Sequence, residues 1–218
     1  DNLDLRYEFF PKSSEQFMVG MFYKRLKNPI EYGLLNEGQD TYYKPMNFGN
    51  ATNLGVEVDV MKYFNWFGIK ANYTYTHSSI TTEKRIMDGN DVKTCTQTRP
   101  LFGQAAHVAN LSLLFKSTKY GWEGQIAGSY TGKRLSDISN WYDDDIWEDG
   151  YMQLDASVEK SFKNGISLFA KASNLLDTRF IQNGPRTENV NSERNNGNVI
   201  ERKEWHGQSF MLGIRYKL

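Results

Sequence analysis

The feature that most constrains this chain is a two-residue alternation of apolar and polar side chains that recurs along its length. In residues 209–218 every even-numbered residue is aromatic or aliphatic, whereas the odd-numbered ones include Ser209, Arg215 and Lys217. Such a period places two kinds of side chain on opposite faces of a β-strand. The same period recurs at residues 3–9, 17–23, 53–64, 67–76, 109–115, 122–131, 153–159 and 166–172. No window of similar length keeps a helical period, so the sequence predicts an all-β protein of about nine antiparallel strands.

The connections between these segments alternate between short and long. The short ones read "PKSSE", "NW", "STKYG" and "FKNG", and the long polar ones cover about residues 27–52, 78–104, 134–150 and 177–201. A soluble sandwich gives no reason for every second connection to be long. A membrane β-barrel does, because its periplasmic turns are short and its extracellular loops are long. The pattern therefore favours an antiparallel meander that spans a membrane as part of a β-barrel.

Composition is compatible with this class and excludes others. Lys plus Arg and Asp plus Glu both number 26, so the chain has no basic excess of the kind that nucleic-acid binding requires. No run of about 18 apolar residues is present, which excludes a membrane-spanning helix. The mean hydropathy of −0.64 does not argue against a barrel, because a barrel strand carries lipid-facing residues only at alternate positions.

Aromatic residues gather near the predicted strand ends, where the interfacial girdles of a barrel would lie. They are Tyr23, Phe64, Trp66, Phe67, Tyr120, Trp122, Tyr151 and Tyr216. The opposite faces of the predicted strands carry residues such as Lys70, Asn72, Gln125 and Glu159, as the wall of a polar lumen would. Aromatic residues beside the turns of a soluble core are the alternative interpretation.

The parity of the strands predicts a piece of a larger barrel. The last strand follows a long connection, so it would run from outside to inside, and counting back nine strands places the start of the first one outside. A complete bacterial barrel has an even number of strands, with both ends on the periplasmic side. We therefore expect residues 1–218 to be the C-terminal part of a transmembrane β-barrel domain.

Several stretches carry a resemblance to a known family. They are "LDLRYEFFPKSSEQFMVGMFYKRLKNPI", "NFGNATNLGVEVDV", "FGQAAHVANLSLLF", "YMQLDASVEKSF", "ISLFAKASNLLDTRF" and the closing "GQSFMLGIRYKL". In this order they resemble the C-terminal barrel of TonB-dependent outer-membrane receptors of the Bacteroidetes type. The resemblance departs at the last position, where Leu218 replaces the usual terminal aromatic.

The resemblance implies a location, a partner and a transport function. Such receptors lie in the bacterial outer membrane, and an N-terminal plug domain, absent from this chain, fills a barrel of about 22 strands. They bind a small extracellular molecule and import it with energy from TonB, which acts through the missing N-terminal part. The implied ligand is an iron siderophore, haem, cobalamin or a glycan.

The sharpest candidate for ligand contact is "WYDDDIWEDG", residues 141–150, which places five carboxylates within seven positions beside two tryptophans. Crowded oxygen ligands suit Ca²⁺, but the spacing does not match an EF-hand loop, so we predict no metal site. The tryptophans suit stacking on a sugar or an aromatic ligand, and a plain solvated loop is the alternative. Arginines in the Asn-rich connection between the last two predicted strands would suit an anionic ligand. The predicted ligand-binding residues are Trp141, Tyr142, Asp143, Asp144, Asp145, Trp147, Arg186 and Arg194.

No enzymatic site is predicted. The sequence has no Gly-rich phosphate loop and no nucleophile elbow, so we expect neither a catalytic residue nor a cofactor. His77, His107 and His206 are scattered over different segments, and Cys95 is a lone thiol in a long connection. A function from another class stays open, namely a soluble β-sandwich that binds carbohydrate through the Trp-rich loop. Dependence on detergent separates that module from a barrel.

Overall fold

The computed structural model describes residues 1–37, 40–185, 194–195 and 198–216, which form strands and connections without a helix. Within these ranges no helix is long and apolar enough to cross a membrane. The strands are β1 (Asn2–Lys12), β2 (Glu15–Leu26), β3 (Ile30–Glu37), β4 (Asp40–Asn47), β5 (Ala51–Phe64), β6 (Phe67–Asp88), β7 (Asp91–Arg99), β8 (His107–Ser117), β9 (Trp122–Thr131), β10 (Arg134–Asp137), β11 (Ile146–Glu148), β12 (Tyr151–Ser161), β13 (Ile166–Ser173), β14 (Arg179–Gly184), β15 (Arg194–Asn195), β16 (Asn198–Trp205) and β17 (Ser209–Tyr216).

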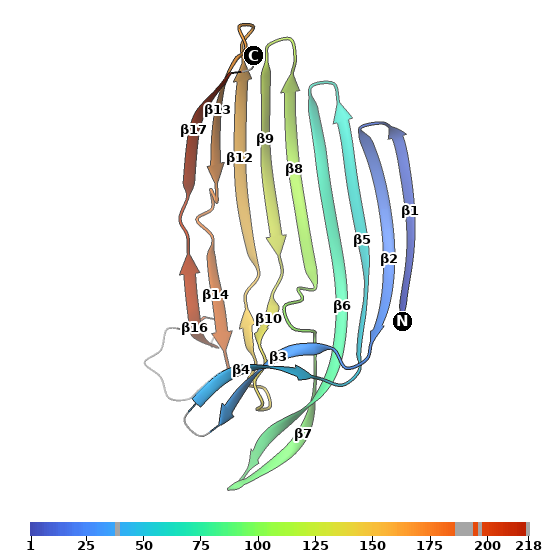
Figure 1. The fold of residues 1–218 in the computed structure, drawn as a ribbon, viewed down its shortest axis with the longest axis vertical. Helices are drawn as coiled ribbons and strands as arrows, with labels where there is room; N and C mark the ends of the chain where they lie inside the picture. Colours follow the sequence, from blue (N-terminus) through green and yellow to red (C-terminus); the bar gives the residue numbers. More distant parts are fainter. Residues whose placement is uncertain (38–39, 186–193, 196–197, 217–218) are drawn as a thin grey trace.

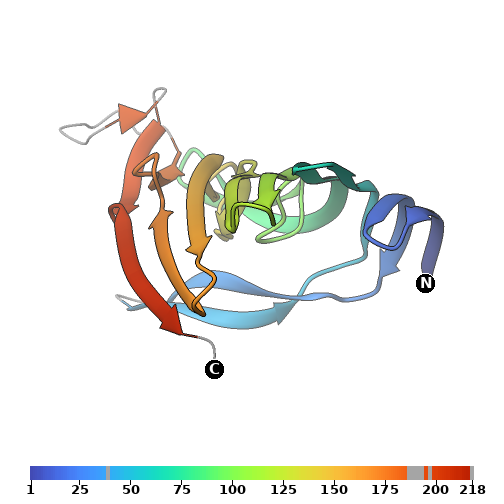
Figure 2. The ribbon, with the colours of Figure 1, turned by 90° about the horizontal axis from the view of Figure 1, so that it is seen from above.

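Nine of these strands form one antiparallel wall, in the order β1-β2-β5-β6-β8-β9-β12-β13-β17 (Figure 1). They coincide with the nine segments that the alternation predicts, so the predicted all-β meander is confirmed. Each wall strand is hydrogen-bonded to the wall strand before it, as short hairpins and antiparallel returns require. Seen from above, the wall is a single curved sheet (Figure 2).

All the long connections lie at one end of the wall, and the short turns lie at the other (Figure 1). β1 begins at the long-connection end, and β17 runs toward the short-turn end, as the parity predicts. The long connections are not plain polar loops, however. They form the β3–β4 hairpin, the β7 strand that pairs with the outer part of β6, and a five-stranded sheet in the order β10-β11-β14-β16-β15. We call this end the loop end.

The two faces of the wall differ as the alternation predicts. On one face, Val19 pairs with Tyr7 and Val58, and Val58 pairs with Tyr73, so apolar side chains continue from strand to strand. On the other face the Asn110 amide donates to the Asn72 amide oxygen at 2.8 Å. Along β6 this polar face continues to Ile80, which is buried at the loop end.

The concave side of the wall is crossed at the loop end by the β3–β4 hairpin (Figures 1 and 2). The polar face of the wall is the one that meets this hairpin, because Arg99 pairs with Ile80 across β6 and β7 and its side chain also bonds to Glu31 of β3. The polar face therefore lines the concave side, and the apolar face is convex.

Aromatic side chains mark the short-turn end of the apolar face. The rings of Phe64 and Phe67 stack with centroids 4.8 Å apart, and Trp66 meets Phe115 edge-on at 5.7 Å. This cluster agrees with a predicted interfacial girdle. Tyr151 does not belong to it, because it lies near the loop end and its ring packs on Phe180 with centroids 4.7 Å apart. The position of an aromatic residue near a strand end therefore does not by itself indicate whether its side chain lies on the apolar or the polar face of the wall.

Glycines on the polar face give room for rings to lie flat against the wall. A Cβ added to Gly213 would meet the Phe169 ring at 2.3 Å, and one added to Gly68 would meet Tyr63 at 2.6 Å. Such aromatic–glycine pairs keep large rings within the wall layer of a sheet. They explain why apolar rings occur on a face that is otherwise polar.

The assignment of faces is tested at the middle of β8, where adjacent residues point to opposite sides. We expect Leu113→Arg to cost about 2–4 kcal/mol if Leu113 lies near the bilayer midplane, because a charged group would enter hydrocarbon. Ser112→Arg should cost much less, since Ser112 lies on the polar face. Refolding titrations of the two variants into lipid vesicles measure both costs, and equal small costs would contradict the assignment.

Candidate functional site

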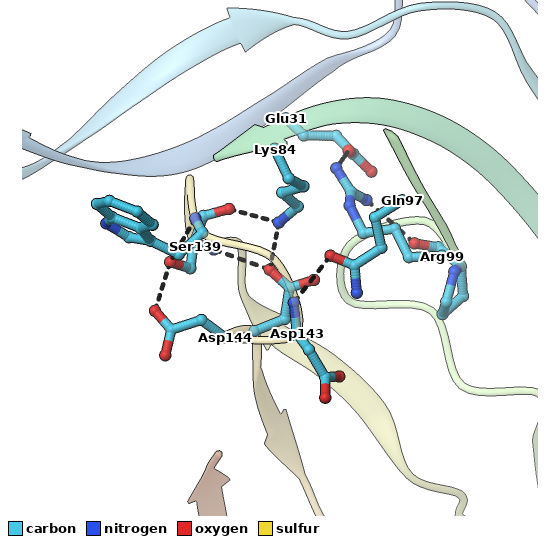
Figure 3. Close-up of polar contacts among 10 residues, drawn as sticks. Glu31, Lys84, Gln97, Arg99, Ser139, Asp143 and Asp144 are labelled. Atoms are coloured by element: carbon cyan, nitrogen blue, oxygen red, sulfur yellow. Dashed lines mark hydrogen bonds and ion pairs between the residues drawn. The ribbon is translucent and has the colours of Figure 1, made fainter. Parts of the chain in front are cut away.

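The loop end is held by two buried ion pairs, and the first joins β6 to the segment that follows β10. The Lys84 ammonium donates to Asp145 Oδ1 at 2.7 Å, with side chains that are 1% and 3% exposed (Figure 3). Lys84 also donates to the Ser139 carbonyl oxygen. Burial lowers the pKa of Lys84 below its usual value of 10.5, and the hydrogen bond to Asp145 opposes that shift. The pair fixes residues 139–145 against the β6 extension.

The second buried ion pair joins the base of the β3–β4 hairpin to the end of β7. Arg99 donates to Glu31 Oε2 at 2.8 Å (Figure 3), and the Phe102 amide donates to the other Glu31 oxygen at 2.7 Å. The Arg99 guanidinium also lies over the Phe48 ring, 5.2 Å from its centroid. Both carboxylate oxygens are thus paired, which a buried charge requires.

The hairpin is anchored again farther along, beside β10. The Leu34 amide donates to the Ile138 carbonyl at 2.9 Å, and the Tyr43 hydroxyl donates to Asp137 at 2.7 Å. This hydrogen bond to a carboxylate, with burial and the Asp137 charge, raises the pKa of Tyr43 to about 12. Unlike the Arg99–Glu31 pair, the Tyr43–Asp137 bond of this second anchor is exposed.

Residues 139–145 form a turn that is held by internal hydrogen bonds and by bonds to β6 and β7. The Ser139 hydroxyl donates to Asp144 at 2.6 Å and accepts from the Trp141 amide at 3.1 Å. Asp145 Oδ1 accepts from the Ser139 amide at 2.9 Å. Asp143 adopts a left-handed backbone with φ of 56°, a conformation that Asp tolerates better than most residues. The turn is therefore a fixed scaffold, and the alternative of a plain solvated loop is wrong for Asp145.

A cavity of about 600 Å³ opens between this turn, β11 and the end of β14. It is lined by Lys133, Tyr142, Asp143, Asp144, Asp145, Trp147, Asn183, Gly184, Pro185 and Asn198. The Lys133 ammonium lies 5.1 Å from the centroid of the Trp147 ring. The volume lies in the range of small-molecule sites in proteins.

The cavity brings together five of the predicted site residues, Tyr142 to Asp145 and Trp147. Trp141 does not line it, and its amide instead closes the turn on Ser139. Arg186 lies outside the described residues, and the structure describes only the backbone of Arg194. Sequence reasoning missed Lys133, Asn183 and Asn198, which come from three separate segments and carry no local pattern that marks them.

A smaller cavity of about 250 Å³ lies on the other side of the β10–β11 pair. Its lining residues are Arg134, Glu148, Phe180, Gln182, Arg202, Glu204 and His206. The Arg134 guanidinium donates to Glu148 at 2.7 Å, and Arg202 is paired with Glu204. Its two arginines are therefore matched by two carboxylates, which leaves no excess positive charge for an anionic ligand.

The histidines do not converge. His107 shares a hydrogen bond of 2.8 Å with the Tyr73 hydroxyl on the apolar face, and His206 packs near Phe180. Within the described ranges no group of three or more His, Cys, Asp or Glu side chains is placed to hold a metal ion. Cys95 is a half-buried thiol of β7, opposite Lys84 in the β6–β7 register.

Comparison with known proteins gives the family. The model of the TonB-dependent receptor-like β-barrel family matches residues 1–175. The chain belongs to the TonB-dependent receptor family. A comparison with curated proteins gives no match.

Solved receptor structures share the fold of this receptor barrel. Two structures of the ferric enterobactin receptor of Pseudomonas aeruginosa, both of mutants, superpose with a TM-score of 0.58 at 17% identity. In each case 98% of this chain is covered, but it spans only 30% of the receptor chain. One of them is a complex with enterobactin.

The Lys84–Asp145 pair can be tested against an exposed pair on the same β6–β7 hairpin. Lys84→Met leaves a buried carboxylate without its cation and should destabilise the loop end by about 3–5 kcal/mol. Lys93→Met removes an ion pair to Asp88 whose side chains are 61% and 62% exposed, and should change little. Hydrogen exchange of the Ser139 amide in the purified protein measures the opening free energy. A Lys84→Met cost no larger than that of Lys93→Met would contradict the role given to the buried pair.

Tyr43 predicts a pH dependence at the second anchor of the hairpin. Because its pKa is about 12 in the folded state against 10 for a free tyrosine, its stabilising contribution is complete below pH 10. It is lost as the pH rises from 10 toward 12. The tyrosinate absorbance that Tyr43→Phe removes should therefore titrate near pH 12. In an Asp137→Asn background the same difference should titrate at lower pH, and an unchanged titration would show that Asp137 is not the cause.

Proposed function

We propose that this chain supplies barrel wall and extracellular ligand loops to an outer-membrane receptor that imports a scarce nutrient with energy from TonB. One observation carries the proposal. The wall has a continuous apolar convex face and a polar concave face, and it ends in structured loops that enclose a cavity lined by tryptophan and carboxylates. Membership of the TonB-dependent receptor family supports the same reading.

The exposure of the apolar face disfavours the alternative of a soluble sandwich. Leu111, Leu113 and Ile126, in the middle of the wall, are each about half exposed, at 51%, 49% and 51%. A sandwich would bury these residues under a second sheet. A bilayer covers such a face without any further protein layer.

The edges of the wall support a larger barrel. Among the described residues, β1 and β17 each pair with a neighbour on one side only. In lipid an open edge leaves backbone N–H and C=O groups unsatisfied. We therefore propose that further strands complete the barrel, that a plug domain fills its lumen, and that residues 1–218 form the C-terminal part of the barrel domain.

The proposed ligand is a small extracellular molecule of one of four classes: an iron siderophore, haem, cobalamin or a glycan. The solved neighbours are ferric enterobactin receptors at 17% identity, a likeness of fold that does not select among the four classes. TonB would act through the plug-bearing part, and the receptor would be of the Bacteroidetes type.

The function is tested by uptake in a strain that lacks the receptor gene. Radiolabelled ferric enterobactin, haem, cobalamin and an uncharged oligosaccharide serve as the four probes. The full-length receptor should restore uptake of one of them, and uptake should stop when TonB is deleted or the proton-motive force is collapsed. A receptor-dependent uptake that persists without TonB would show a passive pore instead. Residues 1–218 alone should restore none, because the wall is open.

A further inference from the structure

Two of the residues that line the cavity beside residues 139–145 carry buried acceptor atoms that lack donors. Asn183 is 2% exposed, and its Oδ1 atom accepts no hydrogen bond among the described residues. Asp145 is 5% exposed, and its Oδ2 atom is likewise unpaired, whereas its Oδ1 atom is bonded to Lys84 and Ser139. Both residues line the same cavity. An unmade hydrogen bond of a buried polar atom costs about 1–3 kcal/mol, so these atoms favour a ligand that brings donors.

The charge of the cavity disfavours an anion. Asp145 is neutralised by Lys84, so the other formal charges among the described lining residues are the carboxylates of Asp143 and Asp144 and the ammonium of Lys133. Two negative groups against one positive group leave the described part of the lining at −1. A highly charged anion such as an iron catecholate would meet repulsion here, because like charges in a partly desolvated site are unfavourable.

The aromatic residues of the cavity add flat surfaces. Trp147 is half-buried in β11 with Lys133 over its ring, and Tyr142 is exposed at the rim. Rings of this kind stack on the apolar faces of ring-shaped ligands and carry large contact area at low entropic cost. The cavity is thus lined by hydrogen-bond acceptors, amides and aromatic rings. Such a lining matches a ligand that presents hydroxyl donors around apolar ring faces.

We propose that this cavity binds an uncharged saccharide and selects against anionic iron chelates. The inference rests on the proposed function, since it names the ligand class of the loops of that receptor. Asn183 and Asp145 accept hydroxyl protons, and Trp147 stacks on a sugar ring. Asp143 and Asp144 accept further hydroxyl protons at the rim and repel anions.

The test uses the full-length receptor, purified in detergent, with three sets of probes. They are an array of uncharged oligosaccharides, an array of sulfated and sialylated oligosaccharides, and ferric enterobactin. We expect binding to members of the first array only. Asn183→Leu should weaken that binding about tenfold, which corresponds to one lost hydrogen bond of about 1.4 kcal/mol. Trp147→Ala should weaken it several-fold, whereas Trp205→Ala, on an exposed tryptophan outside the cavity, should not.

A second pair of variants keeps the test decisive if Asn183→Leu fails to fold. Asp143→Asn and Asp144→Asn change residues near the rim and should weaken saccharide binding only a few-fold while raising affinity for the anionic probes. Binding of ferric enterobactin or anionic glycans by the unmodified receptor, without binding of neutral glycans, would overturn the ligand class and leave the proposed function standing. Neutral-glycan binding that Trp147→Ala and Asp143→Asn do not weaken would overturn the site. Binding of no probe would overturn the inference. The proposed transport function would then be tested separately by the measurement of TonB-dependent uptake.

Discussion

Backbone hydrogen bonding is the constraint on which the rest of this structure depends. In hydrocarbon no water replaces a missing partner, so each peptide group of a wall strand must bond to a neighbouring strand. The central wall pairs β5–β6, β8–β9 and β12–β9 accordingly run without a register shift. At the loop end, where water is present, shifts occur within the β10–β11 and β14–β16 pairs. One of them falls between Gln182 and Asn183, and bulges of this kind re-aim side chains.

At the loop end, buried ion pairs rather than apolar packing determine how the connecting segments are arranged. The buried apolar residues are few: Ala51, Ile80, Ala105, Leu135 and Ile138 among those described. The buried pairs Lys84–Asp145 and Arg99–Glu31 adjoin them, because Arg99 lies opposite Ile80 and Lys84 bonds to Ser139, the residue after Ile138. A buried ion pair adds little net stability, but the loss of either partner is costly. Such pairs therefore select one arrangement of the loops over alternatives in which a charge would be buried alone.

The sequence predicted the wall well and the loop end poorly. The difference depends on whether the surroundings of a side chain follow from its local position along the strand. Along the wall one face meets lipid and the other meets a polar interior, so the pattern of β8 or β17 follows from local position alone. At the loop end each side chain meets a different partner. Residues 91–99 read as polar loop, yet they form β7 and contribute the buried Arg99. Asp145 looked solvated because its partner, Lys84, lies 61 residues away along the chain.

The two anchors of the β3–β4 hairpin differ in what their rupture would cost. Opening the base would separate Arg99 from Glu31 in a buried setting, which leaves charges unpaired. Opening the farther contact would break the exposed bond between the Tyr43 hydroxyl and Asp137, which water can replace at small cost. It would also break the bond from the Leu34 amide to the carbonyl of the buried Ile138. The base therefore carries buried charges, whereas the farther contact combines one exposed side-chain bond with one backbone bond at a buried residue. Because the hairpin crosses the concave side at the loop end (Figure 2), its farther contact lies beside β10, whose neighbour Lys133 lines the saccharide-sized cavity.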